Sequence, residues 1–346
     1  MKTSIHSVFL LASFVLIFSS CKRDQPVTPV NNGTAVTPGM GAFVVDEGNY
    51  LGGNAKISFF KFSDASVTED MFQPINIRPL GDVGQSMTLI NGKEYIVVNN
   101  SGKIEVVNPS NCFATNTITG FTSPRYILPV SATKAYVSDL FANAISIVNL
   151  SSNTRSGSVP FPAESEAMVM ANGEVFVSST SSDKVYVMNP NTDAVTDSIA
   201  VAKGGNSMVI DNNGKLWVLC YGDYFTSAAG GLFRINTSTH LVEQSFPFTT
   251  AESPTRLCSN TTGDTLYYLD YGVMRMASNA VTLPASAFIP QSTQNFYGLG
   301  IRPNGEIFVA DAVDFSQRGH LLQYAPSGTL LNNVTVGVIP GTIYFY

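Results

Sequence analysis

The sequence predicts an all-β protein, and within that class a seven-bladed β-propeller. The first observation is a β-rich run with a central aromatic residue that recurs seven times, at spacings of 52, 41, 40, 41, 50 and 41 residues. The second is that another β-rich run follows each of these. A period of about 40–50 residues with four short strands is typical of propeller blades. The seven aromatic residues are Phe43, Tyr95, Tyr136, Phe176, Trp217, Tyr267 and Phe308.

The two runs of each repeat alternate apolar and polar residues, which predicts half-buried strands rather than helices. The aromatic-centred runs occupy residues 41–48, 93–100, 134–141, 174–181, 215–222, 265–272 and 306–313. The runs that follow occupy residues 56–62, 103–109, 144–150, 184–190, 231–237, 273–279 and 320–326. A short apolar run precedes most aromatic runs, and a less regular strand ends each repeat. Asn-Gly pairs at 91–92, 172–173 and 304–305 predict tight hairpin turns with positive φ.

The ring is expected to close through the C-terminus. No strand-like run precedes Phe43, whereas PGTIYFY at 340–346 resembles the innermost strand of the other repeats. Pairing of this run with the first repeat would close the ring without a free sheet edge. The alternatives are an open array and a six-bladed ring. Because the aromatic residue recurs once per blade, we expect it to pack between blades rather than to bind a ligand.

The N-terminal residues predict export and lipidation. A positive charge at Lys2 and an apolar run at 8–18 are typical of a signal peptide, and the run is too short to span a membrane. The sequence Phe18-Ser19-Ser20-Cys21 resembles a bacterial lipobox, except that Phe18 stands where an aliphatic residue is usual. We therefore expect a lipoprotein signal peptide at 1–20, a tether at 21–40 lipidated at Cys21, and the propeller at 41–346. An ordinary secretory signal is the alternative.

The tether predicts an outer-membrane location, with the protein held by its lipid anchor. Residues 22–39 contain three prolines and no apolar periodicity, which is typical of an extended linker. Residues 22–24 partly resemble the charged signal that sends some Bacteroidota lipoproteins to the cell surface. This resemblance favours exposure at the cell surface.

Composition excludes several classes of function. The formal net charge of −6 argues against nucleic-acid binding, which depends on Lys and Arg contacts to phosphates. Only three histidines are present, and the sequence contains no recognisable acid–base pair, nucleophile–histidine pair or phosphate loop. We therefore expect neither an enzyme nor a cofactor, and His240 and His320 are interpreted as structural. Cys112, Cys220 and Cys258 are expected to be buried thiols, with a Cys220–Cys258 disulfide as the alternative.

In four repeats the strand expected within the aromatic-centred run ends in aspartate. Asp46, Asp139, Asp270 and Asp311 suggest either a ring of carboxylates around a cation or repeated capping of a turn. Recurrence at one position of the repeat favours turn capping. No metal site is therefore predicted.

Candidate ligand-binding residues lie where each innermost strand begins. In a propeller these positions surround a central funnel, which is the usual place for a ligand. The polar residue differs from blade to blade, which suits an asymmetric ligand with several hydrogen-bonding groups. The predicted residues are Gln85, Arg125, Glu166, Asn206, Arg256 (or the adjacent Thr255) and Tyr297.

Three long loops add a second group of candidates. They occupy residues 47–55, 220–231 and 311–320 and are rich in aromatic residues. Aromatic rings and arginine provide a large contact area with few rotatable bonds, as binding surfaces require. The candidates are Tyr50, Tyr221, Tyr224, Phe225, Phe315 and Arg318.

The repeat, with stretches such as VYVMNPNTDAV and IEVVNPSN, resembles the YncE-like seven-bladed propellers. The opening DEGNYLGGNAKISFFKF, the stretches LGDVGQSM and SPRYI, and the closing RPNGEIFVADAVDFSQRGHLLQY resemble more specifically the BtuG-type surface lipoproteins of Bacteroidota. This resemblance covers nearly the whole mature chain. It implies capture of cobalamin or a related corrinoid and its transfer to a TonB-dependent outer-membrane transporter.

Two other functions stay open at this stage. The same face could bind a polypeptide, so that the protein acts as a surface scaffold for protein–protein interaction. A propeller enzyme, such as a lactonase or a quinone-dependent dehydrogenase, is the less favoured alternative. The fold by itself does not decide among these functions.

Overall fold

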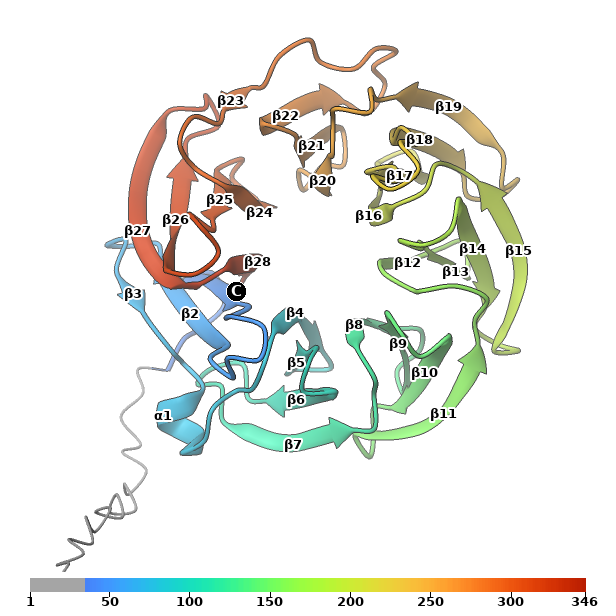
Figure 1. The fold of residues 1–346 in the computed structure, drawn as a ribbon. Coiled ribbons are helices and arrows are strands. Elements are labelled where there is room, and N and C mark those ends of the chain that lie inside the picture. Colours follow the sequence, from blue (N-terminus) through green and yellow to red (C-terminus); the bar gives the residue numbers. More distant parts are fainter. Residues whose placement is uncertain (1–34) are drawn as a thin grey trace, which may run out of the picture.

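A computed structural model describes residues 35–346 of the chain. Seven four-stranded antiparallel sheets are arranged as blades around a central axis (Figure 1). The predicted fold class and blade number are thereby confirmed. The predicted signal peptide, Cys21 and the tether residues up to 34 lie outside the described residues.

The strands follow one another along the chain, blade by blade. Blade one contains β28 (Pro340–Phe345), β1 (Gly41–Asp46), β2 (Lys56–Lys61) and β3 (Val67–Thr68). Blade two contains β4 (Gly84–Ile90), β5 (Lys93–Val98), β6 (Lys103–Val107) and β7 (Ala114–Thr119). Blade three contains β8 (Pro124–Pro129), β9 (Lys134–Asp139), β10 (Ala144–Asn149) and β11 (Thr154–Pro160). Blade four contains β12 (Met168–Ala171), β13 (Glu174–Val177), β14 (Lys184–Asn189) and β15 (Ala194–Ala200).

The last three blades repeat this pattern. Blade five contains β16 (Gly205–Ile210), β17 (Lys215–Cys220), β18 (Gly231–Asn236) and β19 (Val242–Pro247). Blade six contains β20 (Thr255–Ser259), β21 (Thr265–Leu269), β22 (Gly272–Ala277) and β23 (Ile289–Pro290). Blade seven contains β24 (Phe296–Ile301), β25 (Ile307–Asp311), β26 (Arg318–Tyr324) and β27 (Leu330–Val338). One short helix, α1 (Gln73–Asn76), follows β3.

The C-terminal strand closes the ring, as predicted. Strand β28 pairs antiparallel with β1, with Phe43 opposite Tyr344 and Val44 opposite Ile343. It lies at the inner end of blade one, beside β24 of blade seven (Figure 1). The first blade is therefore built from both ends of the described chain, and β1 has no free edge at the centre of the ring.

The recurring aromatic residues form the core between blades. All seven are buried, and each belongs to a cluster that joins strands of neighbouring blades. At the closure, Phe308 of blade seven packs edge-to-face against Phe60 and Phe345 of blade one, at ring distances of 5.7 and 5.3 Å. Replacing a buried aromatic of this kind with alanine typically costs about 3–5 kcal/mol. This column therefore has the predicted packing role.

The predicted hairpin turns are found at two of the three Asn-Gly pairs. Asn91 and Gly92 both have positive φ, and so do Asn172 and Gly173. In the third pair only Gly305 has positive φ, because residues 302–306 form a longer turn in which Glu306 N–H donates to the Asn304 side chain. The turn type in this case depends on loop length as well as on the residue pair.

The chain contacts the propeller before residue 41. Val36 is buried in the core between blades one and two, and its N–H donates to the carbonyl of Ser110 at 2.8 Å. Gly39 N–H donates to the carbonyl of Tyr346. Residues 36–40, which the composition assigns to the tether, are thus attached to the ring.

The cysteines and aspartates have mostly structural surroundings. Cys112, Cys220 and Cys258 are free thiols, so the alternative Cys220–Cys258 disulfide is not formed. Asp139 accepts hydrogen bonds from four backbone N–H groups, and Asp311 accepts from those of Asn295 and Val313, as expected for turn capping. Asp46 differs, because its side chain accepts a hydrogen bond from Ser58 Oγ at 2.6 Å in the neighbouring strand.

Candidate functional site

Residues from the start of the innermost strands meet at one end of the central axis. There they enclose a cavity of about 340 Å³, which we call the funnel. Five of the six predicted mouth residues line it, together with the alternative Thr255 and with Tyr221 from one of the long loops. The lining residues are Glu47, Val83, Gln85, Arg125, Tyr126, Asn206, Ser207, Tyr221, Thr255, Arg256 and Tyr297.

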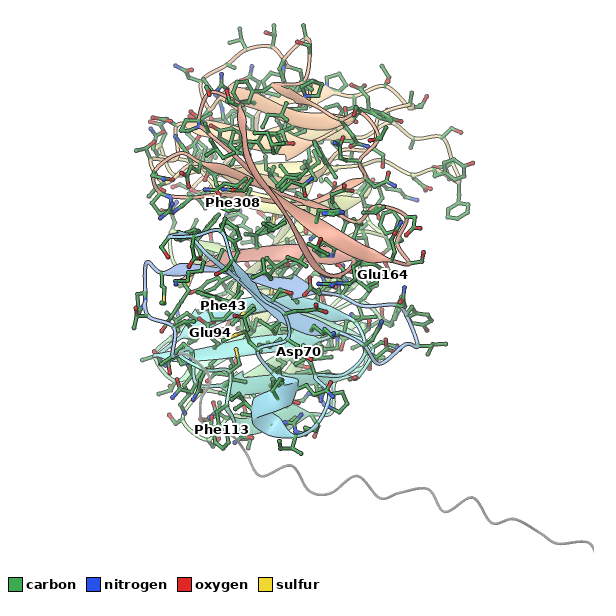
Figure 2. The ribbon with its side chains drawn as sticks, turned by 90° about the vertical axis from the view of Figure 1, so that its left-hand side faces the viewer. Phe43, Asp70, Glu94, Phe113, Glu164 and Phe308 are labelled. Atoms are coloured by element: carbon green, nitrogen blue, oxygen red, sulfur yellow. The ribbon has the colours of Figure 1, made fainter. Side chains whose placement is uncertain are left out.

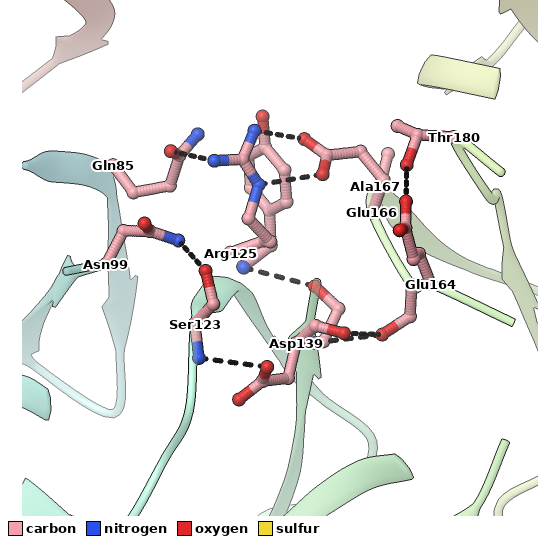
Figure 3. Close-up of polar contacts among 12 residues, drawn as sticks. Gln85, Asn99, Ser123, Arg125, Asp139, Glu164, Glu166, Ala167 and Thr180 are labelled. Carbon is pink, nitrogen blue, oxygen red and sulfur yellow. Dashed lines mark hydrogen bonds and ion pairs between the residues drawn. The ribbon is translucent and has the colours of Figure 1, made fainter. Parts of the chain in front are cut away.

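Arg125 joins three blades through one guanidinium group (Figure 3). Its Nε and Nη2 atoms donate to the two carboxylate oxygens of Glu166, each at 2.7 Å, and Nη1 donates to Gln85 Oε1. Gln85 belongs to β4, Arg125 to β8, and Glu166 precedes β12. The side-chain nitrogens of Arg125 are therefore all engaged, in a bidentate pair that fixes the geometry of the group.

The carboxylate of Glu166 favours the charged form of Arg125. Burial by itself would lower the pKa of Arg125, but the Glu166 carboxylate outweighs burial and raises it. Glu166 is almost fully buried, so its charge depends on Arg125 for compensation. Glu166 was predicted to contact ligand, but it is not among the residues that line the funnel.

Arg256 has the same charge but a different set of partners. Its Nε donates to the carbonyl of Tyr297 at 2.8 Å, and the guanidinium carbon lies 4.8 Å from the centre of the Tyr297 ring. The nearest carboxylate oxygen, on Glu47, is 3.6 Å from Nη2, which is beyond hydrogen-bond distance. Among residues 35–346, neither Nη atom has a hydrogen-bond partner. Arg256 thus presents donors that an acceptor in the funnel could use.

The backbone at Arg256 also requires an explanation. Its φ is +60°, in the left-handed region that side chains other than glycine and asparagine rarely adopt. The register of β20 against β21 shifts at this point, between Thr255 and Cys258. The resulting bulge orients the Arg256 side chain towards the funnel. Bulges next to binding sites commonly change the direction of a side chain in this way.

Glu47 and Tyr297 form the wall beside Arg256. The Tyr297 hydroxyl donates to Glu47 Oε2 at 3.1 Å, and the Tyr297 ring packs edge-to-face against Phe315 at 5.4 Å. Burial raises the pKa of Tyr297 to about 12, and burial also raises the pKa of the Glu47 carboxyl. Tyr297 therefore stays protonated at neutral pH and can donate a hydrogen bond.

A second cavity of about 240 Å³ continues along the axis beneath the funnel, and we call it the throat. The two cavities share Tyr126, Asn206, Ser207 and Arg256. The rest of the throat is mostly apolar; these residues are Ala167, Met168, Met208, Leu257, Leu299, Gly341, Thr342 and Ile343. The side chains therefore change from mainly polar at the funnel to mainly apolar in the throat, with Arg256 at the boundary.

Phe315 packs on the funnel residue Tyr297 without lining the cavity, and the other predicted loop residues lie away from the funnel. Tyr50 is exposed and is absent from the funnel lining. Tyr224 and Phe225 project into solvent from the loop at 220–231, with exposed fractions of 93% and 95%. Arg318 is directed outward, where its guanidinium contacts Glu69 at 2.5 Å.

Four lining residues were not predicted: Glu47, Val83, Tyr126 and Ser207. Glu47 was missed because the inner strand of blade one comes from the C-terminus, so the aligned strand starts contain no member for that blade. It follows β1 directly, just as the predicted Tyr221 follows β17, and comparison of these strand ends would have indicated it. Tyr126 was missed because it lies one residue beyond Arg125, within β8.

Two further findings concern metal binding and membrane-spanning helices. Within residues 35–346 there is no group of three or more His, Cys, Asp or Glu side chains arranged to hold a metal ion. Over the same residues, no helix is long and apolar enough to cross a membrane.

Comparison with known families assigns the chain. Residues 40–313 match the family described as Domain of unknown function (DUF5074). This chain belongs to the DUF5074 family. The match covers most of the described blades and shows no corrinoid-binding family. No curated protein sequence matches this DUF5074 protein.

Solved structures similar to this DUF5074 protein share its propeller fold. One is a quinonprotein alcohol dehydrogenase-like protein from Bacteroides thetaiotaomicron VPI-5482, with 16% identity, a TM-score of 0.71, and coverage of 88% of this chain and 78% of that one. Another is a 6-phosphogluconolactonase candidate from Bacteroides uniformis ATCC 8492, with 14% identity, a TM-score of 0.64, and coverage of 88% and 99%. At these identities the likeness concerns the fold alone.

Proposed function

We propose that this DUF5074 protein captures a small nutrient ligand at the funnel, as a lipid-anchored protein of the outer-membrane surface. Cobalamin or a related corrinoid is the proposed ligand, and a TonB-dependent transporter is the proposed recipient. The observation that carries the binding proposal is Arg256. Its Nη atoms donate no hydrogen bond within residues 35–346, the carboxylate of Glu47 being 3.6 Å away, and it lies where the polar side chains of the funnel give way to the mainly apolar side chains of the throat.

The chemistry of the funnel favours an amphipathic ligand with hydrogen-bond acceptors. Arginine donates well to carbonyl, carboxylate and phosphate oxygens. Met208 and Leu257 line the throat below it, where apolar parts of a ligand would be removed from water. A corrinoid combines peripheral amide carbonyls with an apolar rim. Since such a macrocycle is larger than a cavity of about 340 Å³, we expect it to lie across the mouth and direct one amide towards Arg256.

Binding without catalysis is part of the proposal. Arg125 and Glu166 neutralise each other in a bidentate pair, and Glu47 faces both Arg256 and Tyr297. Charged groups that are held by one another in this way can position a ligand, but they are not free to accept or donate a proton. An enzyme would need a free base or nucleophile at the site.

Calorimetric titration of the full-length protein in detergent with cyanocobalamin tests the proposal. We expect saturable binding that Arg256→Gln weakens at least about tenfold, the usual effect of losing a charge-assisted hydrogen bond. Arg275→Gln is the matched control, because Arg275 stacks on Phe288, away from the funnel. No binding at high micromolar cyanocobalamin would exclude the corrinoid, and equal affinity of the two variants would exclude the funnel as its site.

A further inference from the structure

A larger cavity lies beside the funnel, between blades five and six. It has a volume of about 580 Å³, and we call it the lateral pocket. Its lining residues are Tyr221, Asp223, Tyr224, Ser227, Ala228, Thr250, Ala251, Glu252, Ser253 and Tyr271. Only Tyr221 is shared with the funnel. The lateral pocket is therefore a separate site on the same face of the ring.

The loop that carries Tyr224 is held in shape by its own hydrogen bonds. Asp223 and Ala228 exchange two backbone hydrogen bonds, of 2.8 and 3.0 Å. The Asp223 carboxylate accepts from the N–H of Phe225 at 2.9 Å and from Lys203 Nζ at 3.0 Å. A closed turn of this kind holds the backbone that carries Tyr224, which lowers the cost of ordering the loop on binding.

A second tyrosine is held on the other side of the pocket. Tyr271 is 73% exposed, yet its hydroxyl donates to the carbonyl of Ala251 at 3.2 Å, which fixes the direction of its ring. Its φ of +49° is a conformation in which glycine or asparagine is usual in a hairpin turn. A tyrosine in this conformation is strained, and because its side chain is largely exposed, packing does not offset the strain. Strained positions of this kind cluster at binding sites.

The polar groups between these rings are mostly hydroxyls. Among residues 35–346, the side-chain hydroxyls of Ser227, Thr250 and Ser253 have no hydrogen-bond partner. Glu252 accepts from the N–H of Thr249 through Oε2, which leaves Oε1 available. The lining contains no Lys or Arg, which disfavours an anionic ligand, and only two small aliphatic residues, which disfavours an apolar one.

We propose that the lateral pocket binds a neutral carbohydrate. A pyranose ring has one face of C–H groups that packs on an aromatic ring and a rim of hydroxyls that both donate and accept hydrogen bonds. The rings of Tyr224 and Tyr271 match the faces of sugar rings. The free carboxylate oxygen of Glu252 and the three hydroxyls match the rim. The volume admits more than one sugar ring, so an oligosaccharide is the expected form of the ligand.

The test uses the full-length protein and three probes, maltohexaose, cellohexaose and mannohexaose, titrated by calorimetry. We expect at least one of them to bind. The variants Tyr224→Ala and Tyr271→Ala should each weaken that binding at least about tenfold, because each removes a stacking surface. Tyr50→Ala is the matched control, since Tyr50 is another exposed tyrosine but does not line the lateral pocket.

Independence from the funnel is checked with Arg256→Gln, which should leave saccharide binding unchanged even if it abolishes binding of cyanocobalamin. Failure of all three saccharides to bind at 10 mM would overturn the carbohydrate proposal without affecting the funnel. So would equal affinities of wild type and the Tyr224→Ala, Tyr271→Ala double variant. Binding of tetramethylammonium in place of every saccharide would show an aromatic site for a cation and would also overturn it.

Discussion

Two arginines at the funnel show how partners determine the role of a residue. Each side-chain nitrogen of Arg125 donates a hydrogen bond to Glu166 or Gln85, whereas neither Nη atom of Arg256 donates one within residues 35–346. Removing one member of a buried ion pair leaves an uncompensated charge, so Arg125 is required for the fold at this position. Arg256 is the better candidate for ligand recognition, although the sequence assigned both residues the same role.

Buried carboxyl groups determine how stability depends on pH. Burial raises the pKa of Asp46 to about 8, and burial raises that of Glu94 to about 7. Both groups stay protonated in the folded state at pH values where the unfolded chain would release the proton. The unfolded state then binds fewer protons than the folded state, so stability falls as pH rises.

Asp46→Asn tests this dependence. For the wild type, we expect the melting temperature to fall by several degrees between pH 5 and pH 8, through the range that separates the unfolded and folded pKa values. The asparagine variant stays neutral and should lose most of this decline, with Glu94→Gln removing a further part. Differential scanning calorimetry at a series of pH values measures it. An unchanged slope in the double variant would show that these groups are not responsible.

At the scale of the strand, the close approach of β24 to β28 depends on glycine. A Cβ atom on Gly298 would lie 2.2 Å from the carbonyl oxygen of Gly341, so a side chain there requires backbone movement. The two glycines allow blade seven to pack directly on the closing strand.

Gly298→Ala is therefore expected to destabilise the ring, by about 1–3 kcal/mol or more. Gly157→Ala is the control, because a Cβ at Gly157 would meet only Ile147 Cδ1, at 3.7 Å, and its backbone does not have positive φ. Denaturant unfolding followed by circular dichroism compares the two. If both variants unfold at the same denaturant concentration, the close contact between Gly298 and Gly341 does not contribute to the stability of the ring.

For the whole molecule, the funnel and the N-terminal attachment lie on opposite faces of the ring. Val36 contacts Ser110 in the turn between β6 and β7, before β1 begins, while Glu47 enters the funnel directly after β1 ends. A six-residue strand spans about 20 Å, roughly the thickness of the ring. Figure 2 shows this separation from the side, with Phe113 of the β6–β7 turn on the left and Glu164 on the right.

A protein anchored through its N-terminus should therefore present the funnel away from the membrane. We expect a membrane-impermeant maleimide to label Thr226→Cys faster than Phe113→Cys on intact cells, in a Cys258→Ser background. Both positions are exposed in the ring itself. Equal labelling on cells would contradict this orientation, and equal labelling of the purified variants is the control.

The sequence was sufficient for the fold because each blade repeats a local pattern. The seven aromatic residues, the alternating runs and the spare C-terminal run are readable without knowing any contact, and all describe structure within one repeat or its nearest neighbour. The same alignment located Gln85, Arg125, Asn206, Arg256 and Tyr297 at one end of the ring. It missed Glu47, because the blade to which that residue belongs is assembled from both chain ends.

The amino-acid sequence by itself determined the number of blades, the way the ring closes and the residues that face its axis. Only the tertiary structure decided which of these residues have donors to spare, since Arg125 meets its partners across two blade boundaries. The lateral pocket likewise exists only after blades five and six bring Tyr224 and Tyr271 together. Each repeat contains the residues that form its own blade, so the scaffold can be predicted from one repeat at a time. A binding site depends on contacts between blades, which no single repeat contains.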